Sequence, residues 1–252
     1  MNMEGNTIFI TGGTSGIGRG LAEAFHQLGN QVIIAGRRKA LLGEVTTANP
    51  GMKAIELDIS SPESIEAAAK TLIEEYPDLN VLINNAGIMP FDDASTTIDD
   101  TTMQAIVTTN LYGPIRMTSA LIEHLKKQPY AAIVNNTSVL AYVPLASTAV
   151  YSATKAALHS YTLSQRFMLR DSSVTVQEIA PPWVNTDLIK KGDDPRAMPL
   201  DAFIEETIRG LATDREEVIV EAIRPLRDNP GADEHVLVNG FNAEMEANPI
   251  PV

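Results

Sequence analysis

The sequence predicts an α/β fold, a doubly wound parallel β-sheet with helices on both faces, forming a single domain over residues 1–252. Two observations carry this prediction. Short runs rich in valine and isoleucine alternate with longer stretches of helical pattern, as expected for strands buried on both faces of a parallel sheet. No internal repeat, low-complexity tract or linker divides the chain, and 44% of its residues are hydrophobic, enough for one core of ordinary size.

The expected elements follow one another in strand–helix order. The expected strands are residues 6–10, 31–35, 52–57, 81–84, 132–135, 174–179 and 217–220. The expected helices are residues 16–28, 39–47, a helix that begins at Ser61-Pro62, and residues 99–127, 150–169 and 200–212. Proline suits the first turn of a helix because its missing N–H would have no partner there. Residues 187–200 contain Gly192 and two prolines and are expected to form a loop.

Composition excludes several classes of function. The formal net charge of −13 repels phosphate backbones, which argues against nucleic acid as a partner. The chain has no cysteine, which excludes a disulfide scaffold, a thiol nucleophile and a cysteine-ligated metal. It begins without a basic stretch followed by an apolar one, and residues 7–10 are far too short a run to cross a membrane. We therefore expect a cytoplasmic protein without a membrane partner.

The first expected strand ends in a glycine-rich run, Thr11-Gly-Gly-Thr-Ser-Gly-Ile-Gly18. Glycines here permit a tight turn and a close approach to a pyrophosphate, and the following helix offers unpaired N–H groups. A plain structural turn is the alternative, but a Rossmann-type dinucleotide fold needs this loop at its first strand–helix junction. The residues expected to contact the cofactor here are Gly12, Thr14, Ser15, Gly16, Ile17 and Gly18.

Two arginines follow the second expected strand, in Gly36-Arg37-Arg38. An acidic residue at this point of such folds binds the ribose 2′-hydroxyl of NAD, whereas arginine accommodates the 2′-phosphate of NADP. Two guanidinium groups can clamp that phosphate, which a carboxylate would repel. A solvated helix start is the alternative reading. The pair predicts NADP(H) as the cofactor, with Arg37 the larger contributor.

The third and fourth expected strands also end in residues suited to a cofactor cleft. Asp58, followed by Ile59, is placed to cap a helix or to approach the adenine. After the fourth strand comes Asn84-Asn-Ala-Gly87, whose small residues suit a backbone that lies against a dinucleotide. Asn84 and Asn85 are expected to brace the sheet rather than touch substrate. The residues expected to contact the cofactor here are Asp58, Ile59, Asn85, Ala86 and Gly87.

The most specific pattern is Tyr151-Ser-Ala-Thr-Lys155. Positions four apart lie on one face of a helix, so the ammonium group is expected beside the phenol, where a cation lowers the phenol pKa. Ser138, just after the fifth strand, is placed to hold a substrate oxygen. Asn110, inside the long helix, is placed to anchor a water chain to the lysine. Tyr151 is the expected general acid or base.

These features together resemble the short-chain dehydrogenase/reductase family over at least residues 5–190. The matching elements are Thr11 to Gly18, Asp58, Asn84 to Gly87, Asn110, Ser138, Tyr151 and Lys155. The resemblance implies that Asn110, Ser138, Tyr151 and Lys155 form a catalytic tetrad and that Tyr151 and Lys155 also contact the cofactor. It implies hydride transfer between nicotinamide C4 and a substrate carbon, without a metal. In its amino-acid sequence the chain is similar to the oxidoreductases encoded with cell-wall D-alanylation genes.

One departure from the family lies in Ala180-Pro-Pro-Trp-Val-Asn-Thr186. Pro182 stands where the family usually has glycine, which stiffens the backbone and removes an N–H near the nicotinamide. Thr186 still matches the residue that contacts the carboxamide. The resemblance implies cofactor contacts from Pro181, Val184 and Thr186.

The second departure lies at the C-terminal end. Residues 236–240 resemble the family's usual strand and turn, yet Val236, Phe241 and Met245 follow one another at near-helical spacing. We therefore expect a helix over 232–246, a substrate loop or lid over 186–215, and a homodimer formed through the helices that begin near Asp99 and Val150.

The substrate site is expected between the loop after Ile88, residues 139–145 and residues 183–200. These segments are largely apolar, so a hydrophobic, uncharged ketone or aldehyde, or the matching alcohol, is the expected substrate. The side chains expected to line the site are Met89, Phe91, Leu140, Tyr142, Val143, Leu145 and the single tryptophan, Trp183.

Four histidines lack metal-like spacing, so no metal site is expected; they are His26, His124, His159 and His235. His159 shares the helix face of Tyr151 and is expected to have a packing role. A non-catalytic redox sensor is the alternative function, and the intact tetrad argues against it. An extended epimerase or dehydratase would need a larger substrate domain.

Overall fold

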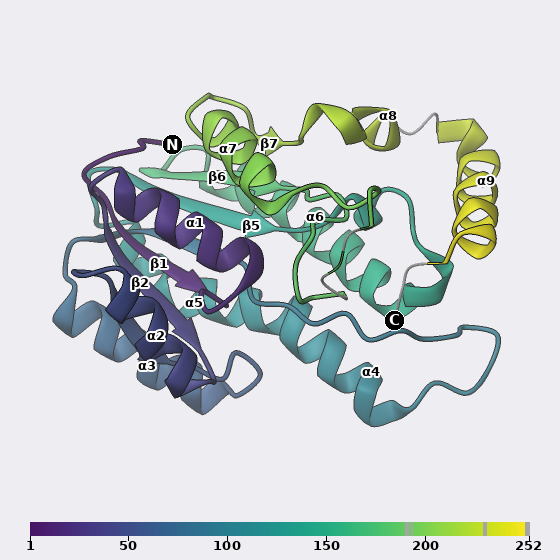
Figure 1. Cartoon of the computed structure of the whole chain (residues 1–252). Coiled ribbons are helices and arrows are strands. Elements are labelled where there is room, and N and C mark those ends of the chain that lie inside the picture. Colours follow the sequence, from purple (N-terminus) through teal and green to yellow (C-terminus); the bar gives the residue numbers. More distant parts are fainter. Residues whose placement is uncertain (190–191, 193, 229–230, 250–252) are drawn as a thin grey trace.

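Seven parallel strands form one sheet in the order β3-β2-β1-β4-β5-β6-β7 (Figure 1). The structure, a computed structural model, describes residues 1–189, 192, 194–228 and 231–249, so part of the expected lid (190–191 and 193) lies outside the described residues. The strands are β1 (Thr7–Thr11), β2 (Gln31–Gly36), β3 (Lys53–Glu56), β4 (Leu79–Asn84), β5 (Ala131–Asn136), β6 (Val174–Ile179) and β7 (Glu217–Val218). This arrangement confirms the predicted doubly wound α/β fold.

Helices connect the strands and cover both faces of the sheet (Figure 1). The α-helices are α1 (Gly16–Gln27), α2 (Lys39–Ala48), α3 (Pro62–Glu75), α4 (Asp100–Val107), α5 (Gly113–Leu125), α6 (Ala149–Leu169), α7 (Leu200–Leu211), α8 (Arg224–Arg227) and α9 (Glu234–Ala247). α9 occupies the segment in which the sequence predicts a helix. In the described part of the chain, no helix is both long and apolar enough to cross a bilayer.

Two hydrophobic cores lie on the two faces of the sheet. Helices α1, α2 and α7 cover one face, where Phe25 and Phe203 pack against strand residues such as Ile10. Helices α3, α5 and the end of α6 cover the other, where Leu72 and Leu121 are fully buried. Alternate residues of each strand point into alternate cores, which explains why the strands are apolar throughout.

The strand order reverses at β1, which pairs with β2 on one side and β4 on the other. In an open sheet of this kind, ligands bind beyond the carboxyl ends of the strands at such a switch point. The glycine-rich run follows β1, and the segments after β4, β5 and β6 meet at the same edge. The fold therefore gathers the predicted site residues at one end of the sheet.

Two of the expected elements differ clearly from those in the structure. The long helix predicted over 99–127 is divided into α4, a π-helical turn (Thr108–Tyr112) and α5. Pro114 has no N–H to donate to the carbonyl of Asn110, so the regular ladder cannot continue there. The last strand is also shorter than predicted, because only Glu217 and Val218 pair with β6.

Candidate active site

The turn after β1 leaves room for a ligand backbone at the start of α1. Gly12 has φ of 70°, a conformation that favours glycine, and a Cβ there would lie 2.9 Å from the Cα of Ala86. A Cβ on Gly18 would lie 2.3 Å from both the Asn85 amide and the Gly12 carbonyl. Ser15 precedes α1 and makes no side-chain cap, so the first N–H groups face the cleft with the positive end of the helix. These features fit a pyrophosphate.

Both arginines after β2 lie beside this turn. The Arg38 guanidinium donates to the Thr14 hydroxyl at 3.3 Å and to the Ser15 hydroxyl at 3.5 Å. Arg37 is exposed, lines the cleft, and helps to hold the pKa of Asp58 below its usual value, although the Ser60 hydroxyl is the main cause. Two cations therefore stand at the edge of the cleft, where a 2′-phosphate would be neutralised.

The asparagines after β4 hold neighbouring strand ends together. Asn84 donates to Asn135 at 2.9 Å and to Thr118 at 3.0 Å. Asn85 donates to the Thr11 carbonyl at 3.1 Å and lines the cleft. Asn84 thus braces the sheet, as the sequence indicates, and Asn85 both braces it and faces the cleft.

Tyr151 and Lys155 lie on one face of α6 and line the cleft together with Ser138. Lys155 Nζ lies 5.5 Å from the centroid of the Tyr151 ring and donates to the Asn136 carbonyl at 2.7 Å. The carboxylate of Asp92 caps the N-terminus of this helix, accepting hydrogen bonds from the backbone N–H groups of Ala149 and Val150 at 2.8 and 2.9 Å. The sequence therefore brings phenol, ammonium and serine hydroxyl to one place.

Burial controls the ionisation of both groups. Burial raises the pKa of Tyr151 to about 12, and hydrogen bonding with Ser138 acts in the opposite direction. Burial lowers the pKa of Lys155 to about 8, and the Glu178 carboxylate partly offsets this. On balance the phenol pKa is raised, opposite in direction to the lowering expected from the neighbouring ammonium group, because burial is the largest effect. The phenol is held protonated, which suits a proton donor.

Asn110 lies in the π-helical turn behind the cleft rather than in its wall. Its side-chain amide clamps the backbone of Ile88, accepting from the N–H at 2.9 Å and donating to the carbonyl at 2.8 Å. It is buried, and a Cβ on Gly87 would lie 3.4 Å from its oxygen and 3.9 Å from Lys155 Nζ. Asn110 therefore fixes the loop after β4 close to the lysine.

The cleft has a volume of about 750 Å³. Every residue named above as a cofactor contact lines it, including Ile17, Gly16, Ile59, Pro181, Val184 and Thr186. Pro182 and Trp183 line it too, so the proline expected near the nicotinamide stands in the cleft wall. This volume is in the range of small-molecule sites in proteins.

Three of the side chains expected in the substrate wall do not line the cleft. Phe91 is 38% exposed on the loop after β4, and Val143 is fully buried in the interior. The hydroxyl of Tyr142 turns away toward Glu178 and Glu217. Met89, Leu140 and Leu145 do line it, as predicted.

The sequence does not identify several residues that line the substrate side. Arg196 lies 5.2 Å above the Trp183 ring and pairs with Asp194 at 2.7 Å. Four apolar side chains arrive from the C-terminal segment: Ile223, Leu226, Phe241 and Met245. The spacing of Phe241 and Met245 indicates their common helix face, but nothing local indicates which cleft that face covers.

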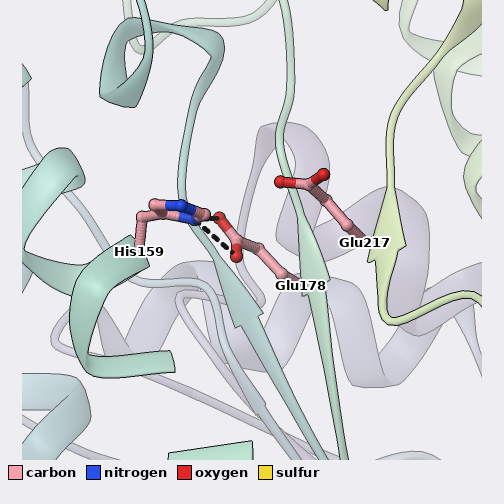
Figure 2. Close-up of side chains that lie close together, drawn as sticks. All are labelled: His159, Glu178 and Glu217. Carbon is pink, nitrogen blue, oxygen red and sulfur yellow. Dashed lines mark hydrogen bonds and ion pairs between the residues drawn. The ribbon is translucent and has the colours of Figure 1, made fainter. Parts of the chain in front are cut away.

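His159 has the expected packing role, because its ring lies edge-on to the Tyr142 ring at 5.0 Å between centroids, and it also forms a hydrogen bond that was not expected from the sequence. Its Nδ1 lies 2.9 and 3.0 Å from the two carboxylate oxygens of Glu178, which is 1% exposed (Figure 2). A signal was present in the sequence, since a carboxylate within an expected buried strand needs a partner.

Comparisons with known proteins agree with this geometry. The family model described as short chain dehydrogenase matches residues 6–197. The chain is 39% identical over 250 residues to the uncharacterized oxidoreductase DltE of Bacillus subtilis, covering 97% of this chain and 99% of DltE. That similarity confirms the expected likeness to oxidoreductases encoded with D-alanylation genes.

Solved structures show the same fold with nicotinamide dinucleotides bound. A short chain dehydrogenase from Burkholderia cenocepacia in complex with NADP superposes with a TM-score of 0.83 at 28% identity, over 94% of this chain and 97% of that one. A 3-ketoacyl-(acyl-carrier-protein) reductase from Brucella melitensis complexed with NADH has a TM-score of 0.79 at 26% identity, over 87% and 98%. With its glycine turn, its buried tyrosine and lysine and these relatives, this chain belongs to the short-chain dehydrogenase family of oxidoreductases.

Proposed function

We propose that this chain is an NADP(H)-dependent oxidoreductase that reduces an uncharged, hydrophobic ketone or aldehyde, or oxidises the matching alcohol. The observation that carries the proposal is that Tyr151, Lys155 and Ser138 line the same cleft as the glycine turn after β1. A nicotinamide dinucleotide held by that turn supplies or accepts the hydride.

The protein's own residues then manage the proton and the substrate oxygen. Tyr151, whose buried phenol stays protonated, gives its proton to the carbonyl oxygen during reduction. Ser138 holds that oxygen by a hydrogen bond and so orients the substrate. Lys155 places a positive charge beside the phenol and stabilises the phenolate that forms. Asn110 keeps the loop after β4 in place beside the lysine and is proposed to anchor the water chain that returns protons.

The preference for NADP(H) rests on Arg37 and Arg38 at the end of β2. No carboxylate stands directly after this strand to bind a ribose 2′-hydroxyl, and two guanidinium groups favour a 2′-phosphate. The chain as a whole carries a formal net charge of −13, so this local pair supplies the attraction that the surface lacks.

The apolar character of the substrate rests on the apolar part of the cleft wall. This part contains Met89, Leu140 and Leu145, together with Leu226 and Phe241 from the C-terminal segment. Such a wall desolvates an alkyl or aryl group and offers little to a charged one. Arg196 is already engaged by Asp194, and therefore does not call for an anionic substrate.

A homodimer acting in the cytoplasm completes the proposal. Large apolar side chains are exposed along α6 and the π-helical turn before α5, the helices through which a dimer is expected: Tyr112, Leu163, Phe167 and Met168. Exposed apolar surface of this kind favours association with a second copy.

The test is a screen of NADPH and NADH oxidation by the wild-type protein over a panel of uncharged aliphatic and aromatic ketones and aldehydes, with keto acids included. The proposal predicts NADPH-dependent turnover that increases with the apolar size of the carbonyl compound. Turnover confined to keto acids would contradict the substrate class, and a preference for NADH would contradict the cofactor.

A further inference from the structure

A second group of polar side chains lies next to the active site, around a carboxylate that acts on the charge of Lys155. Its centre is Glu178 of β6, whose carboxylate is 1% exposed (Figure 2). The Thr137 hydroxyl donates to this carboxylate at 2.5 Å, and His159 Nδ1 lies 2.9 Å from its second oxygen. A carboxylate only accepts, so Nδ1 must carry the hydrogen of that bond. Tyr142 also points its hydroxyl at Glu178, at 3.3 Å.

The sheet brings a second carboxylate to the same place. Glu217 of β7 is the direct register partner of Glu178, so the two side chains lie on the same face of adjacent strands (Figure 2). Like charges directly opposite each other destabilise a sheet unless they are compensated. The compensation is visible: Arg227 donates to Glu217 at 2.7 Å, Tyr142 donates to it as well, and the Arg227 guanidinium lies 4.7 Å from the Tyr142 ring.

The group connects three parts of the active site. His159 lies one turn after Lys155 on α6. Thr137 directly precedes Ser138, and its own N–H donates to the Ile179 carbonyl of β6 at 2.8 Å. Arg227 ends α8, whose Leu226 lines the substrate side of the cleft. One buried carboxylate therefore contacts the lysine helix and the serine segment directly, and reaches the substrate wall through Tyr142 and Glu217.

A metal ion is the alternative occupant of this place. Among the described residues, ligand atoms of His159, Glu178 and Glu217 lie within 4.8 Å of one another. Those atoms are already engaged, because Arg227 neutralises Glu217 and His159 donates to Glu178. A guanidinium group at hydrogen-bond distance from one carboxylate would repel a divalent cation. The contacts therefore favour a hydrogen-bonded network.

We propose that Glu178 is a positioning residue of the active site, whose buried carboxylate, held by His159 and Thr137, fixes Lys155 and Ser138 relative to each other and to the substrate wall. This proposal rests on the proposed function in one respect: the kcat measurements below presuppose that the protein reduces a carbonyl. The position of Glu178 beside the lysine has a second consequence: its charge opposes the lowering of the Lys155 pKa that burial causes.

The test compares Glu178→Gln with Glu216→Gln, which removes an exposed carboxylate that pairs with Arg166. In Glu178→Gln we expect kcat for carbonyl reduction to fall about 10-fold to 100-fold, because misplacement of reacting groups is costly. The KM for NADPH should stay within about twofold, since the phosphate-binding turn follows β1 and Glu178 lies on β6. Glu216→Gln should match the wild type in both constants.

A second readout does not depend on turnover. The side chain of Lys155 can be titrated by NMR in protein labelled with 13Cε-lysine, with Lys155→Met used for assignment. Loss of the Glu178 charge should move this titration to lower pH, whereas Glu216→Gln should leave it unchanged. If the wild type reduces no carbonyl, the proposed function fails, yet the titration still shows whether the Glu178 charge acts on Lys155.

Two variants of His159 test the same network independently, in case the Glu178→Gln protein does not fold. Asparagine at 159 can place an amide N–H close to where Nδ1 stands, so His159→Asn should keep most of kcat, while His159→Leu should lose about 10-fold or more. Equal kcat in both histidine variants, or a Glu178→Gln protein that titrates and turns over like Glu216→Gln, would overturn the proposal. Loss of wild-type activity in EDTA with recovery on adding Zn²⁺ would also overturn it, in favour of a metal site.

Discussion

Lys155 Nζ lies 5.5 Å from the centroid of the Tyr151 ring and donates to the backbone carbonyl of Asn136 at 2.7 Å. The lysine is thus fixed by the end of β5, the same strand end that carries Ser138. The phenol, the ammonium and the serine hydroxyl are therefore positioned by one helix and one strand, and small displacements of either should affect all three.

The first prediction concerns cofactor preference. Arg37→Asp should raise the NADPH KM about 10-fold to 100-fold, because it removes a charged hydrogen-bond donor and adds a charge that repels the 2′-phosphate. The preference for NADPH over NADH should narrow or reverse. Arg209→Asp, which alters an exposed arginine of α7, is the control and should keep the wild-type preference. Steady-state kinetics with both cofactors measures this, and a wild-type protein with the higher kcat/KM for NADH would refute the assignment.

The second prediction concerns the glycine turn. Gly18→Ala should weaken NADPH binding at least tenfold and destabilise the fold by roughly 1–3 kcal/mol, because its Cβ meets the Gly12 carbonyl and the Asn85 amide. Gly43→Ala is a matched control, since a Cβ there meets nothing within 4 Å and α2 gains helix propensity worth roughly 0.5–1 kcal/mol. Urea unfolding and NADPH fluorescence titration measure the two effects. Equal behaviour of the two variants would show that the turn is not tightly packed.

The third prediction concerns pH. Because burial lowers the pKa of Lys155 to about 8, the lysine loses its charge as pH rises through that value. Tyr151, with its pKa raised to about 12, stays protonated over the same range. The kcat/KM for carbonyl reduction at saturating NADPH should therefore be level below about pH 8 and fall above it. A rate that stays level up to pH 10 would show that the lysine charge is not required.

The same lowered pKa of Lys155 affects the stability of the fold in the opposite direction: activity should fall as pH rises, whereas the free energy of unfolding should rise. In the unfolded chain Lys155 keeps its proton up to its ordinary pKa of 10.5, whereas in the folded chain its pKa is about 8. Between these values the unfolded state binds more protons, so the contribution of Lys155 makes the free energy of unfolding rise with pH. Urea unfolding at pH 8 and pH 10, in the wild type and in Lys155→Met, isolates this contribution.

The fourth prediction concerns assembly. Phe167→Glu should convert the proposed homodimer into a monomer, because it places a charge on the exposed apolar strip of α6, where Phe167 is 63% exposed. Val236→Glu alters a side chain of α9 that is 73% exposed, and it should leave the dimer intact. Light scattering of the two variants measures this. A stable wild-type tetramer, or a dimer broken by Val236→Glu instead, would place the interface elsewhere.

Much of the fold and of the cofactor cleft follows from local sequence. The glycine turn, the strand ends and the Tyr151 to Lys155 spacing are encoded within a few residues, because a turn or a helix face depends on neighbours along the chain. The pairing of Glu178 with His159 depends on the register of β6 and on the rotation of α6, and no local pattern encodes either. The same holds for Phe241, whose helix returns to the cleft from the end of the chain.

The proposed chemistry assigns different losses to the residues around the carbonyl group. Lys155→Ala should lower kcat as much as loss of the acid, since it removes the charge that stabilises the phenolate. Ser138→Ala should cost somewhat less, because its hydroxyl orients the oxygen without giving up a proton. Stopped-flow NADPH oxidation in each variant measures the losses, and a Ser138→Ala protein more damaged than Lys155→Ala would reverse the assigned roles.

The most direct test of the proposed mechanism is single-turnover hydride transfer in the wild type and in Tyr151→Phe, with NADPH affinity measured by fluorescence on the same proteins. The variant removes only a hydroxyl, so the fold and the NADPH affinity should be kept. Proton transfer from a positioned acid is worth about 10²–10⁴-fold, and the rate should fall at least that far. If the protein is a redox sensor instead, the wild type should bind NADPH but reduce no carbonyl compound. A Phe variant that binds NADPH normally and keeps near wild-type turnover would show that Tyr151 is not the acid.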